Sequence, residues 1–255
     1  QTIATMKESL LEQLVNSYND MKQNNTYSQD ALNTVKDMIY QVLQETVENQ
    51  HFNSNTTLTL VQNILENILG ITDPDTILTS DQIQSLSNIL SDMLSFSATY
   101  DCNKTTQFTD ELITKTQQYL EKIAQSSLSN KITNENATII DTNNIDMYFQ
   151  TLSICSVNNL AVSAGSSSPQ VTVNINTGLA TNCSTQVNLE LYAFNDDLLN
   201  CSKEVSSDVN KTIIGINITN PETGKTPPGV TVIIDFHGDE SKCPSSCQLL
   251  SDKTC

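Results

Sequence analysis

The stretch VNLELYAF, residues 187–194, alternates apolar and polar side chains, which predicts a β-strand with one buried and one solvated face. The same alternation appears in VTVNIN (171–176), IIGINIT (213–219) and VTVIIDF (230–236). Segments rich in Gly, Pro, Asn and Ser separate these strands, as in SAGSSSPQ (163–170) and NPETGKTPPG (220–229), and favour antiparallel hairpins in a sandwich. The expected buried faces are Val171, Val173 and Ile175; Val187, Leu189, Leu191 and Ala193; Ile214, Ile216 and Ile218; and Val230, Val232, Ile234 and Phe236.

The chain ahead of about residue 137 has the helical period instead, because its apolar residues recur at steps of three and four. Gly70 can take the left-handed conformation that ends a helix, and Thr79 with Gln82 has the spacing of a capping box at the start of another. The expected core-facing stripes are Ile3, Met6, Leu10, Leu14 and Tyr18; Ala31, Val35, Met38, Val42 and Val47; Leu60, Val61, Ile64, Leu65, Ile68 and Leu69; Ile83, Leu86, Ile89, Leu90, Met93 and Leu94; and Leu112, Ile113, Thr116, Tyr119, Leu120 and Ile123.

Helices followed by strands, without alternation between the two, predict an α+β fold, because a parallel sheet requires strands that alternate with helices. We expect an N-terminal helical subdomain over residues 1–135. An antiparallel β-sandwich subdomain should follow over residues 136–255 and end in a cysteine cluster.

The acidity of the chain excludes two classes of partner. The 255 residues carry a formal net charge of −17, and the sequence pI is near 4.2. Binding to phosphate backbones or anionic headgroups begins with Lys and Arg, so we expect neither nucleic acid nor a membrane surface as a partner. No apolar run reaches the roughly eighteen residues of a membrane span, so we expect no direct insertion by this segment. The chain opens at Gln1 without a signal-peptide pattern, which indicates a processed or excised segment.

Acceptor motifs for N-glycosylation, Asn-x-Ser/Thr with a non-proline middle residue, are spread along the chain. An Asn- and Thr-rich sequence also produces such motifs by chance, but none falls on the apolar stripe of a predicted helix. Most lie at turns or strand ends, where a glycan stays in solvent. Together with cysteines suited to disulfides, they predict a secreted or extracellular glycoprotein. The acceptors are Asn24, Asn55, Asn103, Asn136, Asn182, Asn200, Asn210 and Asn217.

Signatures of catalysis are absent from the sequence. The chain has two His residues, His51 and His237, and a nucleophile needs a base within reach. Gly-x-Ser-x-Gly, His-Glu-x-x-His and phosphate-binding glycine loops do not occur. We therefore expect no enzyme activity and no cofactor, with a secreted hydrolase that lacks local motifs as an alternative. A structural calcium site is a further alternative at the carboxylate pairs Asp73/Asp75, Asp196/Asp197 and Asp239/Glu240.

The chain has seven cysteines, an odd number, so at least one is free or pairs outside this segment. We interpret the cysteines as disulfide partners, with Cys183 paired to Cys201, Cys102 paired to Cys155, and Cys255 as the candidate for an outward bond. The full set is Cys102, Cys155, Cys183, Cys201, Cys243, Cys247 and Cys255. A rival interpretation is a zinc site, for which the ligands would be His237, Cys243, Cys247 and Cys255.

The order of parts resembles the GAIN domains of adhesion receptors and polycystin-type proteins. The residues that carry the resemblance are TIIDTNNIDMYFQTLSI (138–154), the strand ahead of SAGSSSPQVTVNIN (163–176), and TPPGVTVIIDFHGDESKC (226–243). The resemblance implies a helical subdomain, a β-sandwich subdomain and a cysteine-bearing proteolysis motif, in which Cys243 and Cys255 match the first cysteine pair. This chain has no Trp after Cys243, has an extra sulfur at Cys247, and lacks the Cys-x-Cys-x-His-Leu segment before a Ser or Thr nucleophile.

We therefore expect a non-enzymatic, N-glycosylated module of a larger membrane-anchored or surface-assembled protein, acting as a structural or adhesive tether. Its expected partners are other extracellular domains of the same protein or neighbouring chains. The resemblance implies an extracellular or cell-surface location, with the ciliary surface of a protist as one setting. The alternative is a self-cleaving GAIN domain whose cleavage strand lies beyond Cys255.

Overall fold

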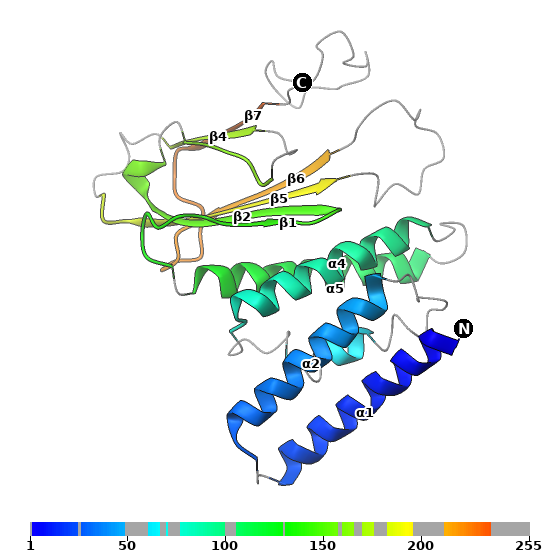
Figure 1. Cartoon of the computed structure of the whole chain (residues 1–255). Coiled ribbons are helices and arrows are strands. Elements are labelled where there is room, and N and C mark those ends of the chain that lie inside the picture. Colours follow the sequence, from blue (N-terminus) through cyan, green and yellow to red (C-terminus); the bar gives the residue numbers. More distant parts are fainter. Residues whose placement is uncertain are drawn as a thin grey trace. The chain divides into compact units, whose positions relative to one another are not determined.

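The computed structural model describes residues 2–24, 27–48, 61–66, 70, 77–99, 106–129, 131–157, 160–165, 170–175, 183–195 and 212–235. Helices come first along the chain and strands follow (Figure 1), which confirms the predicted α+β class. The chain divides into two compact units. The helical unit comprises Gln1–Lys131, Thr142–Ile145 and Phe194–Ile213, and the β unit comprises Ile132–Asp141, Asp146–Ala193 and Ile214–Cys255.

The helical unit contains α1 (Thr2–Asn24), α2 (Gln29–Glu48), α4 (Ser80–Thr99) and α5 (Thr106–Leu128), and residues 61–66 are also helical. Helix α1 packs against α2, α2 against α4, and α4 against α5. Figure 1 shows α1 and α2 running side by side as a helical hairpin.

Local side-chain and backbone features set the helix ends. The predicted capping box is confirmed, because the N–H of Gln82 donates to Thr79 Oγ1 (3.3 Å) and the N–H of Thr79 donates to Gln82 Oε1 (3.2 Å). At the start of α2, the N–H of Ala31 donates to Ser28 Oγ (3.3 Å). Gly70 has a φ of 62°, the left-handed conformation predicted for it.

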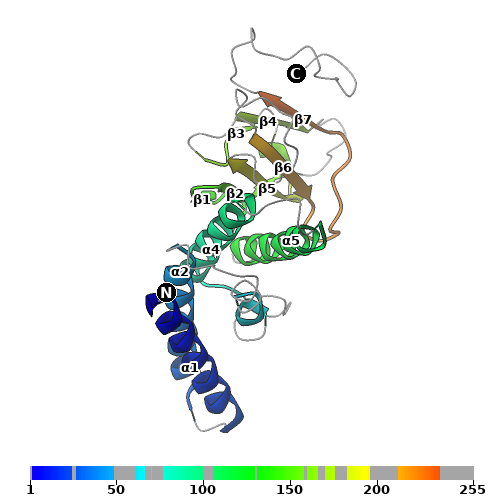
Figure 2. The same cartoon turned by 90° about the vertical axis from the view of Figure 1, so that its right-hand side faces the viewer.

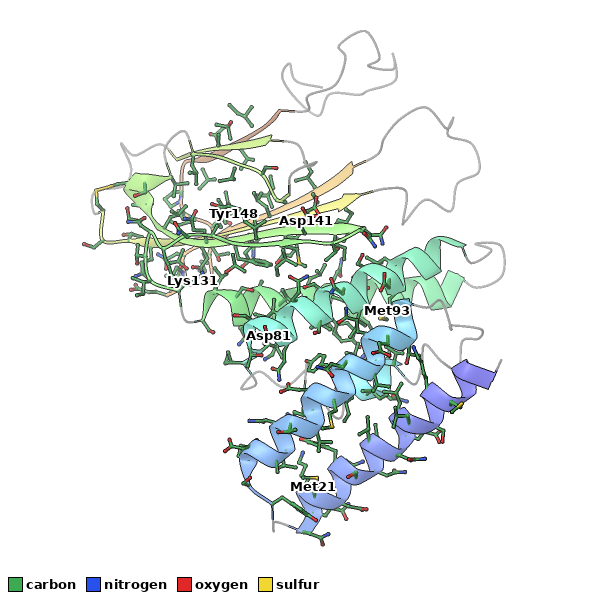
Figure 3. All side chains as sticks on the ribbon, in the orientation of Figure 1. Met21, Asp81, Met93, Lys131, Asp141 and Tyr148 are labelled. Carbon is green, nitrogen blue, oxygen red and sulfur yellow. A yellow bond between two sulfur atoms is a disulfide. The ribbon has the colours of Figure 1, made fainter. Side chains whose placement is uncertain are left out.

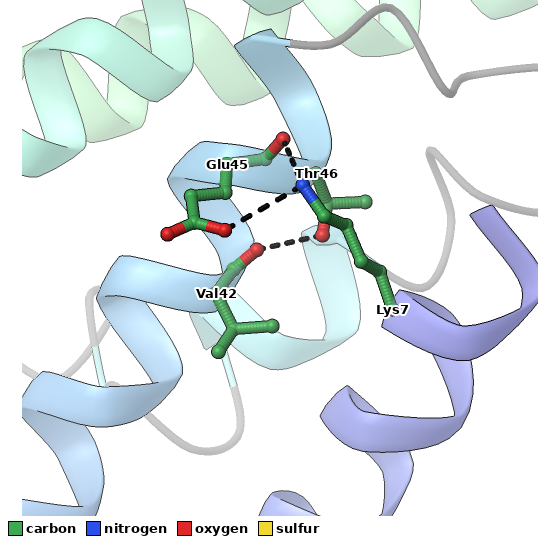
Figure 4. A network of polar contacts seen from close by, with 4 residues as sticks. All are labelled: Lys7, Val42, Glu45 and Thr46. Carbon is green, nitrogen blue, oxygen red and sulfur yellow. Dashed lines mark hydrogen bonds and ion pairs between the residues drawn. The ribbon is translucent and has the colours of Figure 1, made fainter. Parts of the chain in front are cut away.

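A polar contact joins α1 to α2 (Figure 4). Lys7 Nζ donates to the backbone carbonyl of Glu45 (3.2 Å) and lies 3.5 Å from its carboxylate oxygen Oε2. Beside it, Thr46 Oγ1 donates to the carbonyl of Val42 (2.6 Å), so the Thr46 hydroxyl is satisfied within its own helix. Lys7 is thereby held against the last turns of α2, where a cation meets the negative end of the helix dipole.

The apolar stripes predicted for the later helices form the core of this unit. Met93 of α4 is fully buried (Figure 3). The predicted side chains that the structure confirms as buried are Val61, Ile64, Leu65, Ile83, Leu86, Ile89, Leu90, Met93, Leu94, Thr116, Tyr119, Leu120 and Ile123. The placement of Leu60, Ile68 and Leu69 and the side chains of Ile3, Val47, Leu112 and Ile113 lie outside the described part.

Some of the residues predicted to be buried on α1 and α2 are exposed, and the apolar residue next to them in the sequence is buried instead. Met6 and Leu10 are 68% and 44% exposed, whereas Leu11 is 1% exposed. On α2, Met38 is 48% exposed and its neighbour Ile39 is fully buried. Each helix has apolar residues at adjacent positions, so two stripes have the right spacing, and the packing between the helices decides which one is buried.

The β unit contains two sheets (Figure 2). Strands β1 (Thr138–Asp141), β2 (Ile145–Ser153), β5 (Gln186–Asn195) and β6 (Thr212–Thr219) lie in the order β1-β2-β5-β6. Strands β3 (Leu160–Val162), β4 (Gln170–Ile175) and β7 (Val230–Asp235) lie in the order β3-β4-β7. The pairs β1–β2, β3–β4 and β4–β7 are antiparallel, and a 3-10 helix η1 (Ile154–Ser156) follows β2.

A core that draws on both sheets makes this unit a sandwich. The alternation predicted for β5 is confirmed, because Val187, Leu189, Leu191 and Ala193 are each no more than 1% exposed. The other buried members of the core are Tyr148, Leu152, Ile154, Val157, Val162, Ala164 and Ile218, with Ile214, Ile216 and Val230 partly buried against it. Tyr148 is labelled in Figure 3.

Strand β7 departs from its predicted pattern. Val230 packs against the core as expected, but Val232, also predicted to be buried, is 36% exposed. Ile233, on the opposite face, is 45% exposed, in agreement with the predicted alternation. Among the described strands β7 ends its sheet, with only β4 beside it, so its side chains are covered from one flank alone. The side chains of Val171, Val173, Ile175 and Ile234 and the placement of Phe236 lie outside the described part.

No helix within the ranges given above is both long enough and apolar enough to cross a membrane.

Candidate glycosylation sites and disulfide

Asn136 lies on a closed turn, residues 131–137, that leads into β1. The N–H of Glu135 donates to the carbonyl of Ile132 (2.9 Å), and the Glu135 carboxylate accepts from the N–H of Ile132 (3.0 Å). Gln150 Nε2 of β2 donates to the carbonyl of Glu135 (2.7 Å). The backbone of the turn is thus fixed by hydrogen bonds within the turn and to β2. Asn136 itself is exposed to solvent.

Asn134 anchors the same turn to the end of β2. Its N–H donates to the carbonyl of Thr151 (2.8 Å), and its side-chain oxygen accepts from the N–H of Ser153 (3.0 Å). Its φ is 64°, in the left-handed region that Asn adopts more readily than most residues. Asn134 is not among the residues predicted from the sequence, although an Asn shortly before a strand favours such a turn.

Asn217 lies within β6, between the inward-facing Ile216 and Ile218, and is exposed. Its Nδ2 donates to Glu190 Oε2 on the neighbouring strand β5 (3.1 Å). The same carboxylate oxygen accepts from the hydroxyl of Tyr192 (3.0 Å). The acceptor amide therefore belongs to a small polar group on the face of the sheet opposite the sandwich core.

Asn24 is the last residue of α1 and is exposed. It borders an open hollow of about 430 Å³. The hollow offers amide, hydroxyl and carboxylate groups together with one aromatic ring. Its other lining residues are Gln13, Asn16, Ser17, Asp20, Met21 and Tyr27.

Cys155 and Cys183 form a disulfide, with their Cα atoms 5.2 Å apart and a sequence separation of 28. Cys155 lies in η1 directly after β2, and Cys183 lies in the turn that precedes β5. The N–H of Ile154 also donates to the carbonyl of Thr185 (2.9 Å). The disulfide and this hydrogen bond together tie the end of β2 to the start of β5.

The pairings predicted from the sequence, Cys183 with Cys201 and Cys102 with Cys155, are wrong, because Cys155 and Cys183 bond to each other. The short separation of Cys183 and Cys201 in the sequence suggested that these two would pair. The sheet order decides otherwise, since β2 and β5 are adjacent and bring the two sulfurs together.

Many predicted site residues lie outside the described residues. These are the acceptors Asn55, Asn103, Asn182, Asn200 and Asn210; the cysteines Cys102, Cys201, Cys243, Cys247 and Cys255; His51 and His237; and the carboxylate pairs Asp73/Asp75, Asp196/Asp197 and Asp239/Glu240. Within the described ranges, no three His, Cys, Asp or Glu side chains gather as metal ligands.

An ion pair in the helical unit joins residues 61–66 to α5. Lys115 Nζ lies 2.5 Å from Glu66 Oε1, and the Tyr119 hydroxyl donates to the same oxygen (3.2 Å). Burial, together with the Glu66 charge, raises the pKa of Tyr119 above its ordinary value. The Glu66 carboxylate therefore joins residues 61–66 to α5 through an ion pair and a hydrogen bond.

A close contact in the β unit involves Asp146, which is fully buried at the start of β2. A Cβ atom placed on Gly165 would lie 2.8 Å from Asp146 Cβ and nearer still to its carboxyl group. Only glycine fits at position 165. No sequence pattern predicts this contact, because the two residues are distant in the chain.

The chain matches no protein-family model and no curated protein.

Proposed function

We propose that this chain is a non-enzymatic, N-glycosylated extracellular module that acts as a structural or adhesive tether within a larger membrane-anchored or surface-assembled protein. In this proposal the module is GAIN-like, and its partners are other extracellular domains of the same protein or neighbouring chains.

The exposure of the acceptors carries the proposal. Asn24, Asn136 and Asn217 are the acceptors within the described ranges, and the side chain of each is exposed. They occupy three different settings, a helix end, a turn and a strand. Because buried asparagines cannot carry a glycan, exposure in all three settings favours motifs that are used over motifs that arose by chance.

The disulfide supports an oxidising compartment. Such bonds persist in secreted and surface proteins, whereas the reducing cytosol keeps most thiols free. Cys183 is exposed, so cytosolic reductants would reach this bond easily. The sandwich also has a buried core of its own, so the disulfide adds to a fold that the core already supports.

The helical unit followed by a sandwich supports the GAIN-like part of the proposal, since this is the order of parts in that family. The polar clusters within the described ranges join helices or strands to one another, as at Glu66, Lys115 and Tyr119.

The test is expression of the chain through the secretory pathway of a glycosylating cell. Peptide mapping after N-glycosidase treatment should show Asn24, Asn136 and Asn217 converted to aspartate, because the enzyme deamidates each asparagine from which it removes a glycan. Alkylation without reduction should leave Cys155 and Cys183 unlabelled. Unmodified asparagines together with alkylated Cys155 and Cys183 would contradict the proposal.

A further inference from the structure

The four-stranded sheet has two outer strands, β1 and β6, within the described part of the chain. An outer strand presents backbone N–H and C=O groups that can pair with a strand of another molecule. Both strands also expose side chains, since Ile139 of β1 is 58% exposed and Asn217 of β6 is exposed. Pairing between two copies of the chain is therefore a hazard, and it is greater at β6, because β1 has only four residues and ends in the exposed Asp141.

Strand β6 has the composition of an association-prone strand. Its sequence TIIGINIT contains no charged residue and no proline, and most of its residues favour β structure. Lysines, prolines and charged side chains are the usual devices that protect an edge, and β6 has none of them. The formal charge of −17 is carried elsewhere in the chain.

The glycan acceptors coincide with these two edges. The motif Asn136-Ala137-Thr138 ends on the first residue of β1, the motif Asn210-Lys211-Thr212 ends on the first residue of β6, and the motif Asn217-Ile218-Thr219 lies inside β6. The inner strands β2 and β5, which have neighbours on both sides, contain no such motif.

The geometry at Asn217 is compatible with a glycan. An N-linked sugar replaces one of the two hydrogens on Nδ2, so the other hydrogen can still donate to Glu190 Oε2, now 3.1 Å away. That bond would hold the first sugar over the outer face of the sheet, where β6 lies beside β5, so that the rest of the glycan shields β6 from this face. At Asn136 the hydrogen-bonded turn fixes the point at which a glycan leaves the chain, beside the start of β1.

We infer that N-glycans on Asn136 and Asn217 block the two edges of the four-stranded sheet and keep separate copies of the chain from pairing strand to strand. This inference rests on the glycosylation in the proposed function. It adds a specific role for these two acceptors, which the acceptor on α1 does not share.

The experiment compares variants of the whole chain secreted from glycosylating cells. Thr138→Val and Thr219→Val, combined, remove both acceptor motifs and keep a β-branched side chain of similar shape in each strand. Thr219→Ser keeps its motif and is the glycosylated control. Thr26→Val removes the Asn24 motif on α1 and is the control for losing a glycan away from the sheet.

Loss of monomer over time is measured by size-exclusion chromatography with light scattering. We expect the double variant to lose monomer several-fold faster than both controls. Hydrogen exchange on its oligomers should show new amide protection in β1 (138–141), in β6 (212–219) or in both. A monomer as persistent as that of Thr26→Val, or protection gained only elsewhere, would overturn the inference.

Glycan occupancy separates this inference from the proposed function. Glycans at other acceptors but none on Asn136 and Asn217 overturn the inference alone. A chain without any glycan overturns both. The unfolding temperature of each variant is measured alongside, because faster association at an unchanged unfolding temperature identifies loss of edge protection, whereas association that follows a lowered unfolding temperature contradicts it.

Discussion

At residue 165 the backbone passes directly beside the carboxyl group of Asp146, and this approach requires glycine for reasons of space. Gly165→Ala should lower the free energy of unfolding by about 1–3 kcal/mol, the usual effect of an overpacked core position. Urea unfolding followed by circular dichroism measures the change.

Gly215→Ala is the matched control, because a Cβ atom there would lie 3.6 Å from the Tyr192 ring, an ordinary contact. We expect a stability change of no more than about 1 kcal/mol at this position, in the stabilising direction, since alanine restricts the unfolded chain. Equal effects of the two substitutions would show that the contact with Asp146 has no special role.

At the scale of elements, the disulfide fastens η1, at the end of β2, to the turn before β5. The combined change Cys155→Ala and Cys183→Ala should lower the free energy of unfolding by about 3 kcal/mol, as expected for a loop whose ends are 28 residues apart. It keeps the motif Asn182-x-Ser184, so glycosylation there stays possible. The measurement is the urea midpoint of the oxidised protein and of the variant.

Treatment with a reducing agent supplies the control for this prediction. It should lower the midpoint of the original protein towards that of the variant, because it opens the same bond. A midpoint that is the same in the variant and in the oxidised protein would mean that the hydrogen bond between Ile154 and Thr185 and the sandwich core hold this junction unaided.

At the scale of the whole molecule, buried tyrosines in both units tie stability to alkaline pH. Burial raises the pKa values of Tyr40, Tyr119 and Tyr148 above the ordinary value of 10.0. Above pH 10.0 the unfolded chain loses these protons while the folded chain keeps them, so the folded state binds more protons than the unfolded state. The stabilisation is complete below pH 10.0 and is lost as the pH rises through the folded pKa values.

Above pH 10.0 we expect the free energy of unfolding to fall with pH. Tyr40, Tyr119 and Tyr148 should each contribute at most about 1.4 kcal/mol per pH unit to this fall. Urea midpoints measured across the alkaline range test this. Combining Tyr40→Phe with Tyr119→Phe should flatten the decline, whereas Tyr27→Phe is the control, because Tyr27 is 54% exposed. A decline that is unchanged in the double variant would assign it to other groups.

The sequence predicted those features that depend on neighbours in the chain. The capping box of Thr79 and Gln82, the left-handed Gly70 and the alternating burial of β5 were all confirmed. Each follows from spacing within a few residues, where backbone geometry leaves few choices. Helices α1 and α2 each have two apolar stripes with helical spacing, and the stripe predicted from the sequence to be buried is partly exposed.

The amino-acid sequence by itself determined the α+β class, the order of helices before strands and the positions of the Asn-x-Ser/Thr motifs, because period and short motifs are local properties. Only the tertiary structure decided that Cys155 bonds to Cys183, that Gly165 must make room for Asp146, and that Asn217 lies on an outer strand. These three depend on the order of strands in the sheets. That order brings together residues far apart in the chain, and no local pattern specifies it.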